Sequence, residues 1–461
     1  MFKEIKNYLP ALIIAMIASH SLWASSDLKD RIHEMNWDGL DVVWLEEDGL
    51  PQYNLLFYFA DGALSDSTSG LGQTSAMFNL LTAGTRRFSQ RDISDNLEFF
   101  GVDFGARVTH EYSVFHVSGL VKDIIPTMKQ ICHLFKDATF PANELAKEKK
   151  RAEGSIRNMV NHHSALADLA FRELSMMGTP YNYPASGKLK DLKKITQKSL
   201  KAKLEYFNEK VKKKIYISGP KRALSVKNVI NEECGFRGSE QNYVRQVDYK
   251  YTPNDKPQII LVTVPKANQA QVRIGNFLTK PEVKNTELLT LSSGLLGGGF
   301  TSLLMRAVRF HQGLTYSINA FASGQRDYGR AGISTFTKNE TVTELLKTIK
   351  DVIERVENKQ VSQEEFELAR GYIVGSYPFG FEENMAFLSQ LLSYDHEGRP
   401  YEDIYIFPNQ VEKLSLDEVS KNTSEIFDWK RQTIVVLGDK SLLPKLKQLG
   451  NVQVMSYEKF L

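Results

Sequence analysis

The stretch FPANEL at residues 140–145 has a counterpart in VSQEEF at residues 361–366, and the two lie 221 positions apart (361 minus 140). A second match follows: the apolar run that ends at Gly219 resembles the run that ends at Gly438, an offset of 219 (438 minus 219). Two nearly equal offsets indicate an internal duplication. Two copies of roughly 200 residues each are too few and too long for a solenoid.

Each copy mixes helical and strand patterns. Amphipathic helices are predicted at residues 124–135 and 342–356, just before the matching stretches, and another helix at 286–296. Buried or alternating strand patterns occur at 55–59 and 114–120. Long helices between clusters of strands are typical of layered α+β proteins. We therefore expect an α+β fold of two homologous repeats, each a mostly antiparallel sheet with helices packed on one face, in a clam-shell arrangement.

The N-terminus resembles a secretory signal. Lys3 and Lys6 precede an apolar run at residues 9–18, and small residues follow at 24–25. The run is shorter than the about 20 apolar residues that span a bilayer, although an uncleaved membrane anchor is the alternative. The sequence thus predicts a signal peptide at residues 1–24 and a periplasmic or secreted protein.

The remaining chain is long enough for two units, each with its own core. The hydrophobic fraction of 42% and the charged fraction of 25% are typical of soluble globular domains. Residues 236–256 are polar and interrupted by Gly, Pro and Asn, as expected of a linker. We expect an N-terminal repeat at 25–240, a linker at 241–256 and a C-terminal repeat at 257–461.

Charge and cysteine content exclude some classes. The net charge of +3 is nearly balanced and no basic block stands out, which argues against a nucleic-acid binder. Cys132 and Cys234 could form one disulfide, but two cysteines do not make a disulfide framework. The amphipathic pattern around Cys132 favours a buried structural thiol.

Common catalytic motifs are absent from the sequence. The glycine cluster GLLGGGFT at residues 294–301 has Phe300 where a phosphate loop needs a lysine, so a turning loop is the better interpretation. His110 and His116 are six apart in an alternating stretch, and half-buried strand histidines explain them. No H-x-x-E-H, H-E-x-x-H or G-x-S-x-G pattern occurs.

The segment GQTSAMFNLLTAGT at residues 72–85 nevertheless resembles the pitrilysin or insulinase superfamily in its bacterial two-repeat form. Active members carry an inverted zinc motif, H-x-x-E-H, ahead of a Gly-Thr pair. Counted back from the Gly-Thr pair here, the two zinc-ligand positions fall on Ser75 and Asn79, and the general-base position falls on Phe78. The third ligand position, a glutamate on a later helix in the family, falls on Ser155.

All four zinc-site positions have therefore lost the side chains that the chemistry needs. Hydroxyl and amide groups bind zinc poorly compared with imidazole and carboxylate groups. A phenylalanine side chain cannot deprotonate water. The resemblance implies a chain with no metal or other cofactor of its own, inactive as a peptidase by itself.

The C-terminal repeat resembles the family differently. SLLMRAVRFHQGLTYS at residues 302–317 matches the R-x-x-x-G-L-x-Y pattern, with Arg309 and Tyr316 at its two ends. In the family this pair completes the active site built around zinc, where a hydroxyl and a guanidinium can stabilise a developing oxyanion. The preceding glycine-rich loop implies that Gly298 and Gly299 are substrate-binding positions.

Two-subunit members of the family carry zinc on one chain and the Arg/Tyr pair on the other. The resemblance thus implies a non-catalytic partner of a zinc-bearing homologous subunit, acting together on peptides or unfolded polypeptides. Such substrates add as a strand to a sheet edge, which residues 101–109 would supply here. The alternative is a scaffold of the same fold with no part in catalysis. Leu303 and Phe310 depart from the arginine and glutamate usual in the family.

Overall fold

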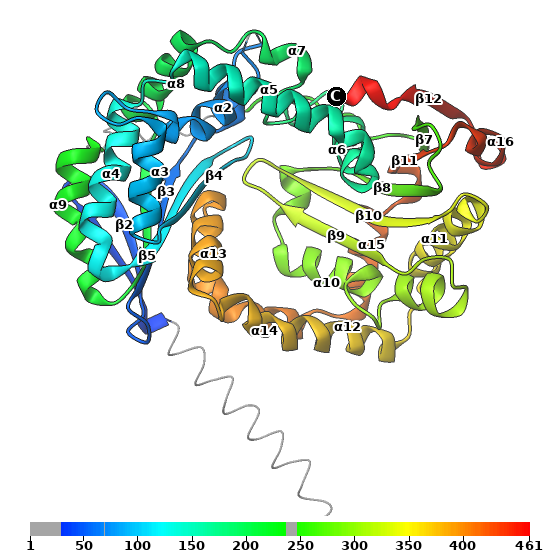
Figure 1. Ribbon diagram of the computed structural model, residues 1–461. Coiled ribbons are helices and arrows are strands. Elements are labelled where there is room, and N and C mark those ends of the chain that lie inside the picture. The colour runs from blue at the N-terminus through cyan, green and yellow to red at the C-terminus, as the bar shows by residue number, and fades with distance from the viewer. Residues whose placement is uncertain (1–28, 69, 237–246) are drawn as a thin grey trace, which may run out of the picture.

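The computed structural model describes residues 29–68, 70–236 and 247–461. The expected signal peptide and residues 241–246 of the expected linker lie outside this described part. Two α+β halves face one another in a clam-shell arrangement (Figure 1). No helix among the described residues is long and apolar enough to cross a membrane.

The first half is built on a six-stranded sheet with the order β1-β2-β6-β3-β5-β4. Only the β2–β6 pair in it is parallel. Its strands are β1 (Ile32–Trp37), β2 (Leu40–Glu46), β3 (Gln52–Phe59), β4 (Asp103–Val108), β5 (Ser113–Leu120) and β6 (Lys213–Gly219). The predicted strand patterns at 55–59 and 114–120 fall in β3 and β5. β4 lies at the edge of this sheet, as expected for residues 101–109.

The second half repeats this plan with the order β12-β7-β11-β8-β10-β9. The strands are β7 (Gln258–Thr263), β8 (Gln269–Thr279), β9 (Ile318–Gly324), β10 (Tyr328–Lys338), β11 (Thr433–Gly438) and β12 (Val452–Ser456). Five strands correspond in the same order, from β2 to β4 and from β7 to β9. The sixth differs in origin, because β1 precedes β2 and runs antiparallel to it, whereas β12 comes from the C-terminal end and runs parallel to β7.

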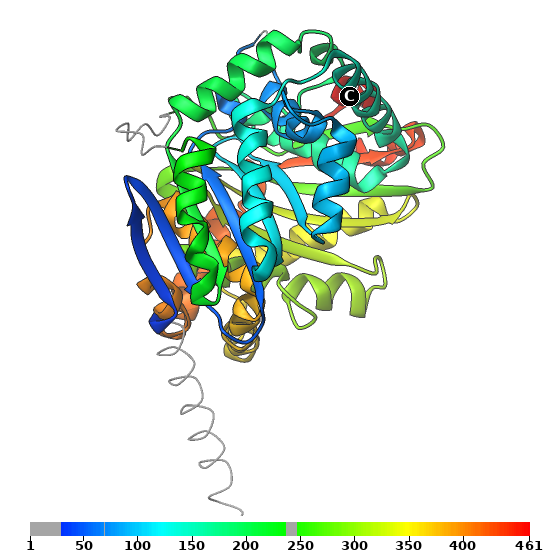
Figure 2. The ribbon, with the colours of Figure 1, turned by 60° about the vertical axis from the view of Figure 1, so that its left-hand side comes forward.

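Helices cover one face of each sheet, as the cyan α4 and its neighbours do for the blue strands in Figure 2. Those of the first half are α2 (Gln73–Asn79), α3 (Gln90–Phe99), α4 (Ile124–Asp137), α5 (Ala142–Asn158), α7 (Leu189–Leu192), α8 (Gln197–Glu209) and α9 (Lys227–Val229). Those of the second half are α10 (Thr286–Gly297), α11 (Val342–Glu357), α12 (Gln363–Ser376), α14 (Glu402–Lys413), α15 (Leu416–Ile426) and α16 (Leu443–Leu446). The three helices predicted from periodicity correspond to α4, α11 and α10.

Local sequence explains where several helices begin. The side chains of Thr196, Ser362 and Ser415 accept hydrogen bonds from the third residue of α8, α12 and α15, and each takes part in a capping box. Side chains at helical spacing then point into one core per half. These helices and their sheet form the layers that the sequence predicts.

Two helices cross between the halves. α6 (His163–Ser175) leaves the first half and packs on the second sheet, where Leu166 and Phe171 join the cluster of Ile260 and Val435. α13 (Asn384–Glu397) packs in return on the first sheet, and its apolar side chains join a cluster with β2, β3 and β6. Figure 1 shows this exchange, with orange α13 beside the first sheet and teal α6 beside the second. The helices begin 221 residues apart (384 minus 163), which is the offset of the repeat.

Cys132 and Cys234 form a disulfide across 102 residues of sequence. Cys132 lies on α4, and Cys234 ends the π-helix η7 (Ile230–Cys234) that packs against α4. Cys132 is buried, as expected, but the prediction of a free thiol was wrong because its sulfur is part of the disulfide. A helical pattern around one cysteine carries no information about the distance to the other.

Candidate functional site

Ser75, Asn79 and Ser155, the positions that the sequence predicts to correspond to zinc ligands, lie on α2 and α5. On α2, the Ser75 hydroxyl donates to the Ala185 carbonyl oxygen at 2.9 Å. Phe78 is only 3% exposed, and its ring lies 5.5 Å from that of Phe59 and 5.4 Å from that of Phe207, between ring centroids. The general-base position is therefore part of the hydrophobic core.

The two remaining positions are exposed. The Asn79 amide donates to Glu148 Oε1 on α5 at 3.3 Å, and Arg151 binds the same carboxylate through two contacts of 2.8 Å. Ser155 lies two turns further along α5. No group of three or more His, Cys, Asp or Glu side chains that could hold a metal occurs in the described part of the chain. This donor set does not fit zinc, which requires imidazole, thiolate or carboxylate ligands.

Arg309 and Tyr316 flank a turn that the fold holds firmly. Arg309 lies on the π-helix η9 (Met305–His311), and the Leu314 amide donates to the Val308 carbonyl at 3.0 Å. Val308 and Leu314 are buried, whereas the Tyr316 side chain is 80% exposed. π-helical turns are rare and frequently occur at functional sites, and helical periodicity did not predict this one. The turn thus presents the Tyr316 hydroxyl to solvent.

The Arg309 guanidinium is held by two aromatic rings. It lies 5.5 Å from the ring centroid of Phe300 and 5.5 Å from that of Phe310. Both rings are exposed, at 67% and 56%. Stacking of this kind leaves the N–H edges of a guanidinium available. We call Phe300, Phe310 and the half-exposed Tyr372 the aromatic surface.

At Gly298 and Gly299, neighbouring atoms leave little room for a side chain. A Cβ atom on Gly298 would lie 2.6 Å from the Gly294 Cα atom, and one on Gly299 would lie 3.3 Å from the Tyr372 ring. The first contact excludes any larger residue without backbone movement. The predicted contact of these glycines with substrate stays a prediction.

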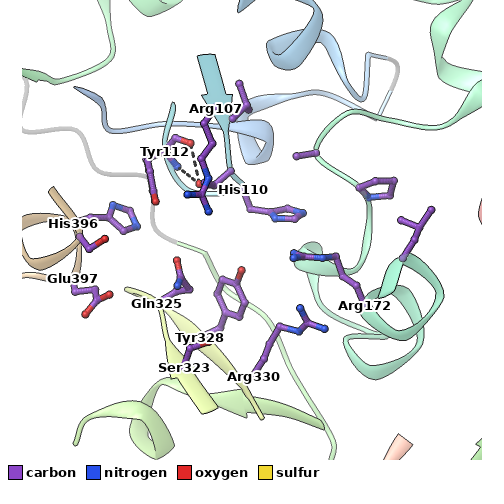
Figure 3. A pocket seen from close by; sticks show the side chains of 16 residues that line it. Arg107, His110, Tyr112, Arg172, Ser323, Gln325, Tyr328, Arg330, His396 and Glu397 are labelled. Carbon is purple, nitrogen blue, oxygen red and sulfur yellow. Dashed lines mark hydrogen bonds between the residues drawn. The ribbon is translucent and has the colours of Figure 1, made fainter. Parts of the chain in front are cut away.

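A cavity of about 460 Å³ lies between the two halves. Its walls come from the end of β4, from α6, from the β9–β10 hairpin and from α13, and Figure 3 shows their side chains converging on it. Ala185, the hydrogen-bond partner of Ser75, also lines it. This cavity could not be predicted from the sequence, because each repeat supplies only part of its lining.

Buried hydrogen bonds join the halves at this cavity. Glu111 Oε2 lies 2.9 Å from His396 Nε2, and the Tyr181 hydroxyl donates to the other carboxylate oxygen at 3.0 Å. The Tyr58 hydroxyl lies 2.9 Å from His396 Nδ1. His110, expected on a strand, lies instead in the β4–β5 turn with Nε2 2.7 Å from the Tyr183 carbonyl oxygen, and burial lowers its pKa. This network connects β3, the β4–β5 turn and α13.

Arginines dominate the charge of the cavity lining. Arg107 on β4, Arg172 on α6 and Arg330 on β10 point into it (Figure 3). Burial, together with the neighbouring Arg172 charge, lowers the pKa of Arg330 to about 10. Burial raises the pKa of Glu397 to about 7, against the effect of Arg399. The cavity is therefore electropositive.

Comparisons with known proteins point to one family of peptidase homologues. Residues 194–372 match the family model described as the peptidase M16 inactive domain. A non-peptidase homolog, YmxG of Helicobacter pylori, is 23% identical over 389 residues, which cover 84% of this chain and 89% of that protein. The uncharacterized zinc protease YmxG of Bacillus subtilis is 22% identical over 311 residues, covering 67% and 74%.

Solved structures share the fold. The peptidase M16 inactive domain from Pseudomonas fluorescens superimposes with a TM-score of 0.76 at 22% identity, covering 89% of this chain and 98% of that one. A protease from Helicobacter pylori gives a TM-score of 0.77 at 14% identity, covering 88% and 99%.

Fold and comparisons together define a duplicated α+β peptidase homologue, and its described residues include no group of side chains that could hold a metal. More particularly, the chain is a homologue of the M16 peptidases, and its match is to their inactive domain. The family resemblance predicted from residues 72–85 and 302–317 is confirmed.

Proposed function

We propose that the chain is the non-catalytic subunit of a heteromeric zinc peptidase. In this proposal a zinc-bearing homologue supplies the metal, and this chain supplies Arg309 and Tyr316 and part of the peptide chamber. The observation that carries the proposal is the exposed Tyr316 side chain, seven residues after an Arg309 that two aromatic rings hold. A structural tyrosine is normally packed, with its hydroxyl bonded, rather than presented to solvent.

The aromatic surface supports an interface at this place. Large aromatic side chains exposed side by side mark sites of protein association, and aromatic residues together with arginine are enriched in the cores of such interfaces. Phe310 stands where the family usually has a glutamate, so the change makes this surface more apolar. A partner seated here would cover Phe300 and Phe310 and would meet Arg309 directly.

The disulfide supports the second part of the proposal, export to the periplasm or the cell exterior. Disulfides persist in oxidising compartments and are rare in the cytosol. The bond between Cys132 and Cys234 thus fits a chain that carries the predicted signal at residues 1–24.

Complex formation tests the partner role. The purified chain is mixed with a homologue from the same genome that retains H-x-x-E-H, and the mass of the species is measured by size-exclusion chromatography with light scattering. We expect a heteromer, which the double variant Phe300→Ser/Phe310→Ser weakens at least about tenfold, because aromatic anchors dominate interface energy. Phe99→Ser is the matched control, since Phe99 is 83% exposed on α3 in the other half. Absence of a heteromer, or equal weakening by Phe99→Ser, would argue for the scaffold alternative.

A further inference from the structure

We propose that the cavity between the halves binds the C-terminal carboxylate of an extended peptide through Arg107, Arg172 and Arg330. The three arginines come from β4, α6 and β10, so both halves of the chain build the site. The anion-binding part of this inference stands by itself. The peptide part rests on the proposed function.

The three arginines lack ion-pair partners in the described part of the chain. Within the described residues, none of the three forms a salt bridge with an Asp or Glu at 4.0 Å or less. Nearby acids have other partners: Glu111 is bound by His396 and Tyr181, and Asp168 pairs with Arg273. Glu397, which also lines the cavity, lies 3.9 Å from Arg399. Arg107 is exposed, whereas Arg172 and Arg330 are partly buried and repel one another. A bound anion would convert this repulsion into attraction.

Arg330 is held in a way that suits ligand binding. Its guanidinium carbon lies 5.3 Å from the ring centroid of Phe171 and 5.9 Å from that of Phe321. Its Nε atom is buried and has no hydrogen-bond partner among the described residues. Buried donors are nearly always satisfied, so this unpaired Nε shows that the hydrogen-bonding capacity of the Arg330 guanidinium is not used up by the described residues. Arginine forks bind carboxylates through paired charge-assisted hydrogen bonds.

The position of β4 favours a peptide as the source of the carboxylate. β4 pairs with β5 on one side only, and its outer edge is open to strand addition within the described chain. Arg107 lies near the end of β4, and Val108 and Thr109 continue into the cavity wall. A peptide lying along this edge would bring one end to Arg172 and Arg330. The cavity, about 460 Å³, is within the roughly 300–1,000 Å³ of small-ligand sites.

Calorimetric titration of the isolated full chain tests this inference. The probes are an unstructured peptide with a free C-terminal carboxylate, the same peptide with a C-terminal amide, and inorganic phosphate. We expect the free acid to bind about 10- to 100-fold more tightly than the amide, as charged hydrogen bonds would give. Arg172→Gln and Arg107→Gln should each remove most of this preference. Arg91→Gln, on exposed α3, is the control that loses one positive charge elsewhere.

Stability gives a second readout that does not depend on the choice of peptide. Arg172→Gln should raise the thermal midpoint at low salt, because it removes repulsion from Arg330, whereas a purely structural arginine would lower it. Phosphate binding that Arg172→Gln abolishes, without any preference for the acid over the amide, would overturn the peptide assignment. Absence of binding by all three probes would overturn the anion site itself.

The partner role is measured in a separate experiment, so failure of this inference can be distinguished from failure of the proposed function. A heteromer that forms normally while acid and amide peptides bind equally would refute only this inference. Preference for the acid without any heteromer would refute only the proposed function.

Discussion

His396 and Glu111 meet across the interface between the two halves, with His396 Nε2 2.9 Å from Glu111 Oε2 and side chains only 2% and 3% exposed. Their remaining polar atoms are bound by Tyr58 and Tyr181. α13 is thereby fixed to the first half by polar contacts as well as by apolar packing. The exchange of α6 and α13 thus joins the two repeats by apolar packing and by buried hydrogen bonds.

Glu111→Ala should lower the free energy of unfolding by about 2–5 kcal/mol, because each buried polar group left unpaired costs about 1–3 kcal/mol. Glu111→Gln should cost less. Its amide oxygen can accept from Tyr181 while its NH₂ group donates to His396 Nε2, provided that the Tyr58 hydroxyl accepts from Nδ1. Urea denaturation followed by circular dichroism measures both variants. Equal losses in the two variants would contradict this account of the network.

Removing the disulfide should destabilise the first half. The double variant Cys132→Ser/Cys234→Ser opens a cross-link over 102 residues, and bonds that close loops of this size typically contribute about 2–5 kcal/mol. The urea midpoint of the oxidised wild type should fall toward that of the variant when reductant is added. A midpoint unaffected by reductant would show that the cross-link does not stabilise the fold.

Glu397 should make stability depend on pH. Its folded pKa of about 7 exceeds the ordinary value of 4.5, so the folded chain keeps a proton that the unfolded chain loses. Stability therefore falls as pH rises from 4.5 through 7, by up to about 3 kcal/mol. Arg399 opposes this shift, and Glu111 adds to it.

Glu397→Gln removes the titration, so its effect should differ between pH values. The variant should be more stable than the wild type at pH 8 and nearly equal to it at pH 4.5. Chemical denaturation at the two values gives the comparison. A stability difference that is the same at both would mean that Glu397 ionises normally in the folded protein.

Much of the fold could be predicted from local patterns. The offset of 221 residues predicted two similar halves, and the periodicity at 124–135, 286–296 and 342–356 predicted α4, α10 and α11. These features are repeated or periodic along the sequence, so each can be recognised without knowledge of distant contacts.

The features missed are those that join distant residues. Glu111 and His396 are 285 positions apart, and Arg107, Arg172 and Arg330 belong to three separate elements. Whether Cys132 and Cys234 are bonded could not be predicted for the same reason. A sequence pattern at one place cannot indicate that α6 and α13 exchange sheets, although their shared offset is visible once the structure is known. The roles of Arg309 and Tyr316 stay predictions.

Turnover by a reconstituted complex tests the central claim most directly. Cleavage of an unfolded peptide is measured for the zinc-bearing homologue alone, for this chain alone, and for the two mixed, with either wild type or Tyr316→Phe. We predict no cleavage by this chain alone and strong activation on mixing. Tyr316→Phe should form the complex normally but slow turnover by about 10²–10³, as loss of a donor to a developing oxyanion does. Undiminished turnover in a normally assembled Tyr316→Phe complex would contradict the claim that this chain completes the active site.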